Sequence, residues 1–245
     1  LAPLALVLTT GVAAAQVGGD LCSPLTFGAV GDGVTDNTTA IQSAINACAK
    51  AGGGAVRLPL VNGHGNYLTG PITLATHVRL LIDKGVTLLG STDHTRYRAA
   101  SINHPYRAHE ALVSAYQADD TGIIGPGTID GQGGAAASDG GPGWWAMKQA
   151  PWLVEFYQCT NVTVNHITLT NAPMWNLVFR YSDHITVSEY TATVTPDPLV
   201  AHIDGIDLIV SSNATLLFLN IGTGGDSVAL NSGPPPNAIA GDPNE

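Results

Sequence analysis

A short unit of sequence recurs in the second half of this chain. Residues 161–164 have the sequence Asn-Val-Thr-Val, and the unit returns as His-Ile-Thr-Val at residues 184–187 and as Asn-Ala-Thr-Leu at residues 213–216. The offsets between the copies are 23 and 29 residues. Short strands that recur at such a period are typical of a solenoid of parallel coils. A Greek-key sandwich would instead require hairpin turns every ~8 to 12 residues.

Short β-rich segments extend this pattern over most of the chain. They are separated by Gly, Asn and Asp, and no amphipathic helix of ordinary length is predicted after residue 59. We therefore predict an all-β solenoid whose coils stack about 4.8 Å apart, so that residues one coil apart become neighbours. Examples of these segments are residues 78–82, 86–89, 122–124, 162–164, 167–169, 185–187 and 214–217.

The segment before this pattern predicts a strand, a turn and a helix. Residues 25–30 are short and apolar, residues 31–33 are Gly-Asp-Gly, and residues 37–50 follow several capping side chains and end at three glycines. The helix can cover the apolar edge at the open end of the solenoid. Its apolar residues recur at the spacing that buries one face; they are Ala40, Ile41, Ala44, Ile45 and Cys48.

The charge balance argues against a nucleic-acid partner. The chain has 19 acidic and 9 basic residues and a formal net charge of −10, whereas binding a phosphate backbone needs clustered cations. Arg180 is the last basic residue of the sequence. An anionic ligand that meets the second half of the chain therefore needs cations from elsewhere.

The first residues predict processing and export. Residues 1–15 are apolar and end in three alanines, which is typical of the apolar and cleavage regions of a secretory signal. A buried helix or a short membrane anchor is the alternative, although about 15 residues are too few to span a bilayer. We expect residues 1–15 to be a residual signal peptide, residues 16–245 to form one β-helix domain, and the protein to be extracellular or periplasmic.

The three cysteines fit an exported protein only loosely, because their number is odd. Cys22 to Cys48 is the favoured disulfide, across the start of the domain, and Cys159 is expected to be a buried small hydrophobe. None of the three has the spacing of metal ligands.

Four stretches of the chain resemble a known family. FGAVGDGVTDNTTAIQSAINACAKAGGGAVRLP at residues 27–59 resembles the opening cap of the pectin-lyase-like right-handed parallel β-helix proteins. GPGTIDGQG at residues 125–133, NAPMWNLVF at residues 171–179 and HIDGIDLIVSSNATLLFLNIGTGGDSVALNSG at residues 202–233 resemble glycoside hydrolase family 28, the polygalacturonase family. The resemblance implies a right-handed, single-stranded parallel β-helix with an N-terminal capping helix.

The resemblance also implies catalytic roles. In this family one carboxylic acid protonates the leaving oxygen while carboxylates on the opposite side activate water, which inverts the anomeric carbon. The family's Asn-Thr-Asp and Gly-Asp-Asp motifs place the two water-activating bases on Asp204 and Asp226. The general acid of the family falls on Gly225, and a glycine has no proton to give.

The spacing of the two acids carries a separate argument. Asp204 and Asp226 are 22 residues apart, close to one coil, so their side chains can project side by side from adjacent coils. Like charges at that separation raise one pKa, which suits acid and base chemistry. The alternative is that both residues cap turns in Gly-rich loops.

Other positions depart from the family. His202 replaces the motif Asn and is a candidate for binding the sugar or a proton; a packed histidine is the alternative. The family's later Gly-His-Gly and Arg-Ile-Lys motifs, which supply a histidine and the cations for the galacturonate carboxylate, do not follow Asp226. We therefore expect the domain to be incomplete at its C-terminus.

Trp144 and Trp145 follow a Gly-rich stretch, residues 139–143. An indole ring can stack on the apolar face of a sugar, although aromatics that anchor a loop or fill the core give the same sequence.

These observations predict a secreted glycosidase that cleaves the α-1,4-galacturonosyl bonds of pectin, with activity impaired by Gly225. A non-catalytic carbohydrate-binding β-helix and a pectin or pectate lyase of the same fold are the alternatives. The expected partner is a pectic polysaccharide. We expect no cofactor, no metal, no nucleic-acid or membrane partner, and a monomer.

Overall fold

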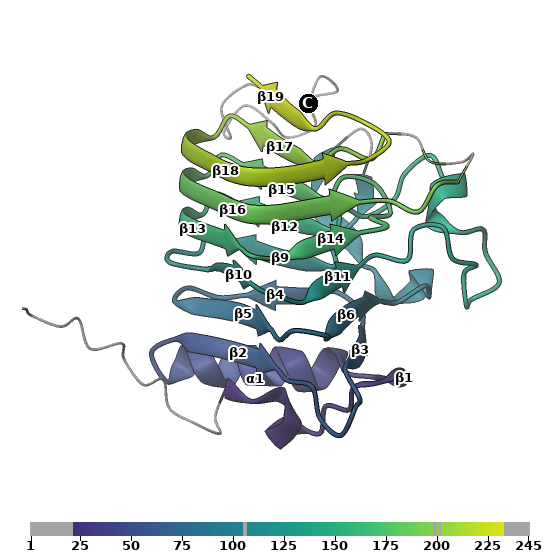
Figure 1. Ribbon diagram of the computed structural model, residues 1–245, viewed down its shortest axis with the longest axis vertical. Helices are drawn as coiled ribbons and strands as arrows, with labels where there is room; N and C mark the ends of the chain where they lie inside the picture. Colours follow the sequence, from purple (N-terminus) through teal and green to yellow (C-terminus); the bar gives the residue numbers. More distant parts are fainter. Residues whose placement is uncertain (1–21, 105–106, 198–199, 201, 233–245) are drawn as a thin grey trace, which may run out of the picture.

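The protein is a stack of parallel β-coils. The computed structural model describes residues 22–104, 107–197, 200 and 202–232. Every pair of neighbouring strands in its two large sheets is parallel, and the chain climbs coil by coil along the long axis of the molecule (Figure 1). The predicted right-handed, single-stranded parallel β-helix is confirmed.

The described elements follow in chain order. They are η2 (Pro24–Phe27), β1 (Asp32–Asp36), α1 (Thr38–Lys50), β2 (Gly54–Leu58), β3 (Asn66–Thr69), β4 (Ile72–Leu74), β5 (Val78–Ile82), β6 (Thr87–Gly90), η3 (His94–Arg96), β7 (Ala99–His104), β8 (Arg107–His109), β9 (Val113–Tyr116), β10 (Gly122–Ile124), β11 (Thr128–Asp130), η4 (Trp144–Ala146), β12 (Val154–Tyr157), β13 (Thr160–Asn165), β14 (Thr168–Thr170), β15 (Leu177–Arg180), β16 (Asp183–Thr193), β17 (Ile206–Ile209), β18 (Ser212–Gly222) and β19 (Val228–Asn231).

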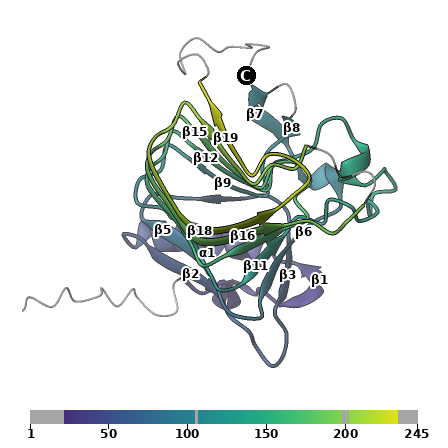
Figure 2. The same cartoon turned by 45° about the horizontal axis from the view of Figure 1, so that its top comes forward.

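Two sheets lie on opposite sides of the interior (Figure 2). The eleven-stranded sheet has the order β1-β3-β6-β11-β14-β16-β13-β10-β5-β2, with β18 paired to β16. The six-stranded sheet has the order β19-β17-β15-β12-β9-β4. The short hairpin of β7 and β8 is antiparallel and separate from both. From β4 onward each coil contributes one strand to the six-stranded sheet, whereas the first coil has α1, which contacts β4, in that place.

The recurring sequence unit marks equivalent places in successive coils. Val162 of β13 lies in register with Ile185 of β16, which lies in register with Ala214 of β18. The residue that precedes each of the three, at positions 161, 184 and 213, has a φ between 50° and 54°. Asn tolerates this left-handed conformation better than most residues. The backbone therefore accounts for the Asn of the repeated unit.

Apolar residues on the inward face of most strands form the core, because side chains alternate between the two faces of a strand, whereas β1 has no buried residue. In the six-stranded sheet one inward row contains Ala115, Phe156, Phe179 and Leu208, matched strand by strand. The rings of Phe156 and Phe179 stack with their centroids 5.4 Å apart. In the last described coil this face is more open, and Leu230 is 76% exposed.

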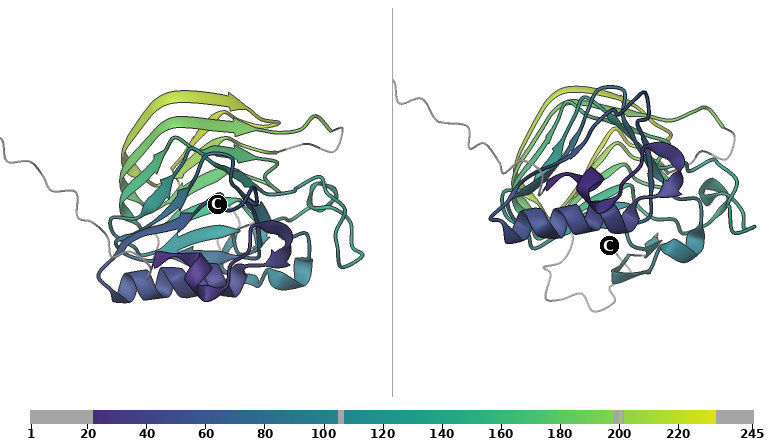
Figure 3. Two further views of the ribbon diagram at one scale, coloured as in Figure 1. Left: turned by 60° about the horizontal axis from the view of Figure 1, so that its bottom comes forward. Right: turned by 90° about the horizontal axis from the view of Figure 1, so that it is seen from below.

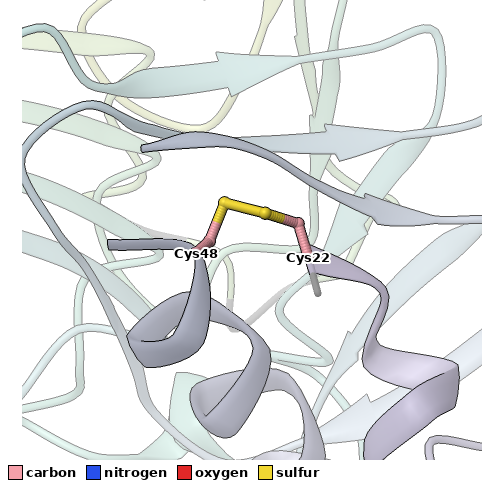
Figure 4. The surroundings of a disulfide bond; sticks show 2 residues. All are labelled: Cys22 and Cys48. Atoms are coloured by element: carbon pink, nitrogen blue, oxygen red, sulfur yellow. A yellow bond between two sulfur atoms is a disulfide. The ribbon is translucent and has the colours of Figure 1, made fainter. Parts of the chain in front are cut away.

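The helix α1 covers one end of the stack (Figure 3). Its buried residues are the five that the sequence predicts, Ala40, Ile41, Ala44, Ile45 and Cys48. The predicted disulfide is present: Cys48, near the end of α1, is bonded to Cys22 (Figure 4). Cys159 is a free thiol in the core, as expected, and it donates to the backbone oxygens of Ala115 and Tyr157.

Two expectations for the first coil were wrong. The segment 25–30 was expected to be a strand, but Pro24 opens the 3₁₀ helix η2, which ends at Gly28 with a φ of 88° and packs mainly against α1, with a smaller contact to β2. The segment 31–33 was expected to be a turn, but Asp32 begins the strand β1, which pairs with β3. The Asp32 carboxylate accepts hydrogen bonds from the backbone of Val34 and Thr35, so turn-forming contacts lie inside a paired strand.

The residues 1–15, which the sequence predicts to be a signal, lie outside the described part of the chain. Among the described residues, no helix has both the length and the apolar character needed to cross a membrane.

Candidate active site

Asp204 and Asp226 lie side by side at the start of two neighbouring strands of the six-stranded sheet. Ile206 of β17 is in register with Val228 of β19, so the 22-residue interval is one coil. The backbone N–H of Asp226 donates to Asp204 Oδ1 over 2.8 Å, and the N–H of Gly205 donates to the Asp226 carbonyl oxygen over 2.8 Å. The two residues are therefore neighbours in adjacent coils, as their interval predicts. Asp204 is half-buried and Asp226 is exposed, so solvent and ligand can reach the pair.

Burial raises the pKa of the Asp204 carboxyl above its ordinary value. The hydrogen bond from the Asp226 backbone opposes this shift, the Asp226 carboxylate adds to it, and His202 lowers the pKa. A carboxylate whose pKa is raised is a stronger base toward water than an ordinary surface carboxylate. The environment of Asp204 therefore suits proton transfer.

Asn176 holds Asp204 from the preceding coil. Its backbone N–H and its side-chain Nδ2 both donate to the carbonyl oxygen of Asp204, each over 2.9 Å. Asn176 is fully buried just before β15. The backbone that carries the Asp204 carboxylate is thus fixed by the coils on both sides. Asn176 lies in the stretch NAPMWNLVF, where nothing in the sequence pattern distinguishes it as a site residue.

Asp207 is a third acid of the site, which sequence reasoning missed. It lies on the outward face of β17, is 1% exposed, and neither carboxylate oxygen has a hydrogen-bond partner among the described residues. Burial, followed by the carboxylates of Asp204 and Asp226, raises its pKa to about 8. Its signal in the sequence was a single acid inside the apolar strand Ile206–Ile209.

Gly225 faces the carboxylate of Asp204. A Cβ atom built on Gly225 would lie 2.0 Å from Asp204 Oδ1 and 3.1 Å from the backbone N of Ile203. A side chain at this position would therefore project directly onto Asp204. With glycine here, the Asp204 carboxylate occupies that space and accepts the Asp226 N–H.

His202 precedes this pair and is exposed, with a left-handed φ of 58°. Its neighbour Ile203 is fully buried. The alternative of a packed histidine is therefore excluded, and the imidazole is open to solvent two residues before Asp204. The nearby His202 lowers the pKa of the Asp204 carboxyl, against the larger effect of burial.

Within the described ranges, no three His, Cys, Asp or Glu side chains are arranged to hold a metal ion. Arg180, the last basic residue, lies on β15 in register with Ile209 of β17. Its side chain is fully buried, and its Nη1 atom lies 3.5 Å from Oε1 of the equally buried Glu155. The Arg180 guanidinium therefore does not present its charge on the surface beside the aspartates.

Comparison with known proteins decides the family. The sequence model of the family described as "Glycosyl hydrolases family 28" matches residues 54–239. The chain belongs to glycoside hydrolase family 28. An endo-polygalacturonase of Pectobacterium parmentieri is 33% identical over 208 residues, which cover 79% of this chain and 50% of the relative. A probable polygalacturonase of Vitis vinifera is 31% identical over 225 residues, which cover 84% of this chain and 43% of that relative.

Solved structures of the family have the same fold. The polygalacturonase of Erwinia carotovora ssp. carotovora superimposes with a TM-score of 0.73 at 33% identity, over 80% of this chain and 55% of that one. The exopolygalacturonase of Thermotoga maritima gives a TM-score of 0.72 at 25% identity. The superposition covers 86% of this chain and 54% of that one. This family 28 chain spans about half the length of the curated relatives that it matches.

Proposed function

We propose that this chain is a secreted glycoside hydrolase that cleaves α-1,4-galacturonosyl bonds of pectin with inversion. The observation that carries the proposal is the pair Asp204 and Asp226, side by side and accessible on one wall of a family 28 β-helix. The relatives at 33% and 31% identity are named as polygalacturonases, which supports the substrate.

Asp204 and Asp226 position and deprotonate the attacking water. Two carboxylates from adjacent coils can share one water, and the raised pKa of Asp204 favours taking up its proton. His202, exposed beside Asp204, contacts the sugar. The leaving oxygen receives no proton from residue 225, because that residue is glycine. We therefore propose that hydrolysis is slow, since loss of general acid catalysis costs about 10² to 10⁴ in rate.

Reducing ends released from polygalacturonate by the purified chain test this proposal. We expect Asp204→Asn and Asp226→Asn each to lower the measured rate by about 10² to 10⁴, and the double variant to be no worse than the poorer single one, because the two groups act on one water. Glu189→Gln, which removes an exposed carboxylate of β16, is the matched control. Full activity in either aspartate variant would contradict the assignment, and a product that retains the anomeric configuration would contradict the inverting mechanism.

Gly225 favours a second candidate, a non-catalytic β-helix that binds pectin. This function predicts that pectic oligosaccharides bind without release of reducing ends. Asp204→Asn should then change the affinity for the oligosaccharide, with no hydrolysis measured before or after the substitution. Unsaturated products, detected by their ultraviolet absorbance, would instead identify a lyase.

Export is part of the same proposal. The Cys22–Cys48 disulfide supports folding in an oxidising compartment, because such bonds are rare in the cytosol. Alkylation of the unfolded but unreduced protein should label one thiol, Cys159. Three labelled thiols in protein from its native source would contradict the proposal.

A further inference from the structure

A cavity separate from the aspartate pair lies where three strands of the eleven-stranded sheet end. Its volume is about 300 Å³. The segment that follows β11 projects from the side of the stack (Figure 1), and the cavity is lined by residues that follow β11, β14 and β16. The residues that line it are Asp130, Gln132, Gly134, Ala135, Trp145, Asn171, Thr195 and Asp197.

One wall of this cavity is the ring of Trp145, held in a fixed place. Its indole Nε1 donates to the Ala172 carbonyl oxygen over 2.9 Å, and its backbone N–H donates to the Gly133 carbonyl oxygen over 3.0 Å. Cβ atoms built on Gly133 and Gly134 would lie 2.2 Å and 2.4 Å from atoms of the ring. Only glycine at both positions lets the ring lie against the backbone.

The two tryptophans of the sequence pair therefore differ in their surroundings. Trp144 is 1% exposed, and its ring lies against the rings of His94 and Tyr97. Trp145 is only partly buried and lines the cavity. The alternative of a core residue therefore holds for Trp144, whereas part of the ring of Trp145 faces the cavity.

The polar wall of the cavity is also fixed before any ligand arrives. Asp130 Oδ1 accepts from the Gln132 N–H over 2.9 Å and from Asn171 Nδ2 over 3.2 Å. Asn171 Oδ1 accepts from the Thr195 N–H over 2.9 Å. Three coils thus orient carboxylate and amide groups toward one space, in which they can bond to hydroxyl groups.

The charge of the lining selects between kinds of sugar. Asp130 and Asp197 supply two carboxylates, and none of the lining residues is basic. A galacturonate residue would bring a third negative charge into the cavity, where like charges repel. A neutral pyranose offers hydroxyl groups to the acceptors and an apolar C–H face to the indole ring.

We propose that this cavity binds a neutral sugar residue carried by a pectic chain. The inference rests on the proposed function, and it specifies the substrate as a galacturonan with neutral sugar branches. Asn171 of the cavity and Asn176, which holds Asp204, are five residues apart. Their Cα atoms can therefore be no more than about 18 Å apart, and one branched oligosaccharide can contact both places.

Two matched probes test the proposal: methyl galactopyranoside and methyl galacturonopyranoside, which differ only in the group at C6. Binding is followed by NMR through the indole N–H signal of Trp145, assigned with Trp145→Phe, at low ionic strength. We expect the neutral glycoside to shift this signal and the acidic one, at the same concentration, to leave it unchanged. An equal or larger shift with the acidic glycoside, or no shift with either, would overturn the proposal.

Variants separate binding from folding. Gly134→Ala retains Trp145 but displaces its ring, so it should abolish the response to methyl galactopyranoside while the other three indole signals stay in place. Asp197→Asn should raise the affinity for methyl galacturonopyranoside several-fold and leave the neutral glycoside nearly unaffected. Unchanged discrimination between the two glycosides in Asp197→Asn would contradict the role of charge.

Asp204→Asn distinguishes the two proposals. It lies outside the cavity, so the Trp145 response should persist even in a protein that hydrolyses nothing. Hydrolysis of unbranched polygalacturonate without any response of Trp145 would leave the proposed function standing and overturn the cavity proposal.

Discussion

The close approach of residue 225 to Asp204 limits which side chains residue 225 can carry. A Cβ at residue 225 would lie 2.0 Å from Asp204 Oδ1, so an acid introduced there requires the Asp204 carboxylate to turn away. That carboxylate is a short side chain held by one hydrogen bond from the Asp226 backbone. Its rotation is less costly than a backbone shift.

Under the proposed function Gly225→Asp supplies a general acid, and we expect it to raise the turnover of polygalacturonate by about 10² to 10⁴. Gly225→Asn is the control, since its amide has nearly the same size and no acidic proton. Reducing-end assays on the two variants check this expectation. Equal rates in both, or no change in Gly225→Asp, would show that the proton donor lies elsewhere.

Asp207 makes a different prediction, about stability. An aspartate ionises near 3.8 in the unfolded chain, whereas the pKa of Asp207 in the fold is about 8. Between these values the folded state holds a proton that the unfolded state has lost. The free energy of unfolding therefore decreases as the pH rises through this window.

Asp207→Asn retains the side-chain shape and cannot ionise. We expect its melting temperature to exceed that of the parent protein near pH 8, and the difference to shrink as the pH approaches about 4. Thermal unfolding followed by circular dichroism at several pH values measures this, with Glu189→Gln as the control for loss of one carboxylate. A difference that does not vary with pH would mean that Asp207 is ionised in the fold.

The sequence predicted some of these residues and not others, for a physical reason. Asp204 and Asp226 were found because their interval matches one coil and both lie in recognisable motifs. Asp207 and Asn176 were not singled out. Their burial and contacts come from neighbouring coils, and a sequence does not state which side chains of other coils surround a given position.

At the scale of elements, the coils are held by close backbone contacts. Gly125, between β10 and β11, lies against the next coil: a Cβ there would be 1.6 Å from the His166 carbonyl oxygen. That atom belongs to backbone, which cannot rotate away as a side-chain end can. Glycine is therefore required at this corner for reasons of space.

We expect Gly125→Ala to lower the free energy of unfolding by more than about 3 kcal/mol, or to prevent folding. Gly222→Ala, at the end of β18, is the control, because nothing lies within 4 Å of the Cβ it would add. Urea unfolding of both variants checks the expectation. A change at Gly125 as small as that at Gly222 would show that adjacent coils can separate at little cost.

Elements with a strong period were predicted well, and short ones were not. The face of α1 was fixed by five apolar residues at helical spacing, and the strand repeat by offsets of one coil. The errors fell on η2 and β1. Each has only four or five residues, and contacts with α1 and β3 decide their structure more than local preference does.

At the scale of the whole molecule, an acidic protein is proposed to meet an acidic polymer. The formal net charge is −10. Several basic side chains are engaged within the protein, for example Arg57 with Asp83, Arg79 with Asp120, and Arg96 with Asp36. The overall field therefore opposes the approach of galacturonan.

We expect the apparent KM for polygalacturonate to fall as salt is raised from about 0.01 M to about 0.15 M, because the screening length shrinks from ~30 Å to ~8 Å. Steady-state rates at a series of ionic strengths measure this. Binding of the neutral methyl galactopyranoside is the control and should stay constant. A KM that rises with salt would instead indicate an attractive patch of cations facing the substrate.

The ladder of backbone hydrogen bonds along the six-stranded sheet does not depend on which side chains face outward from it. A single side chain beside this sheet, such as that of residue 225, can therefore be changed while the scaffold behind it stays intact. In such a protein, the fold and the reactive side chains can change independently of each other. A protein of this fold can therefore bind a polymer whether or not it has the side chains that cleave it.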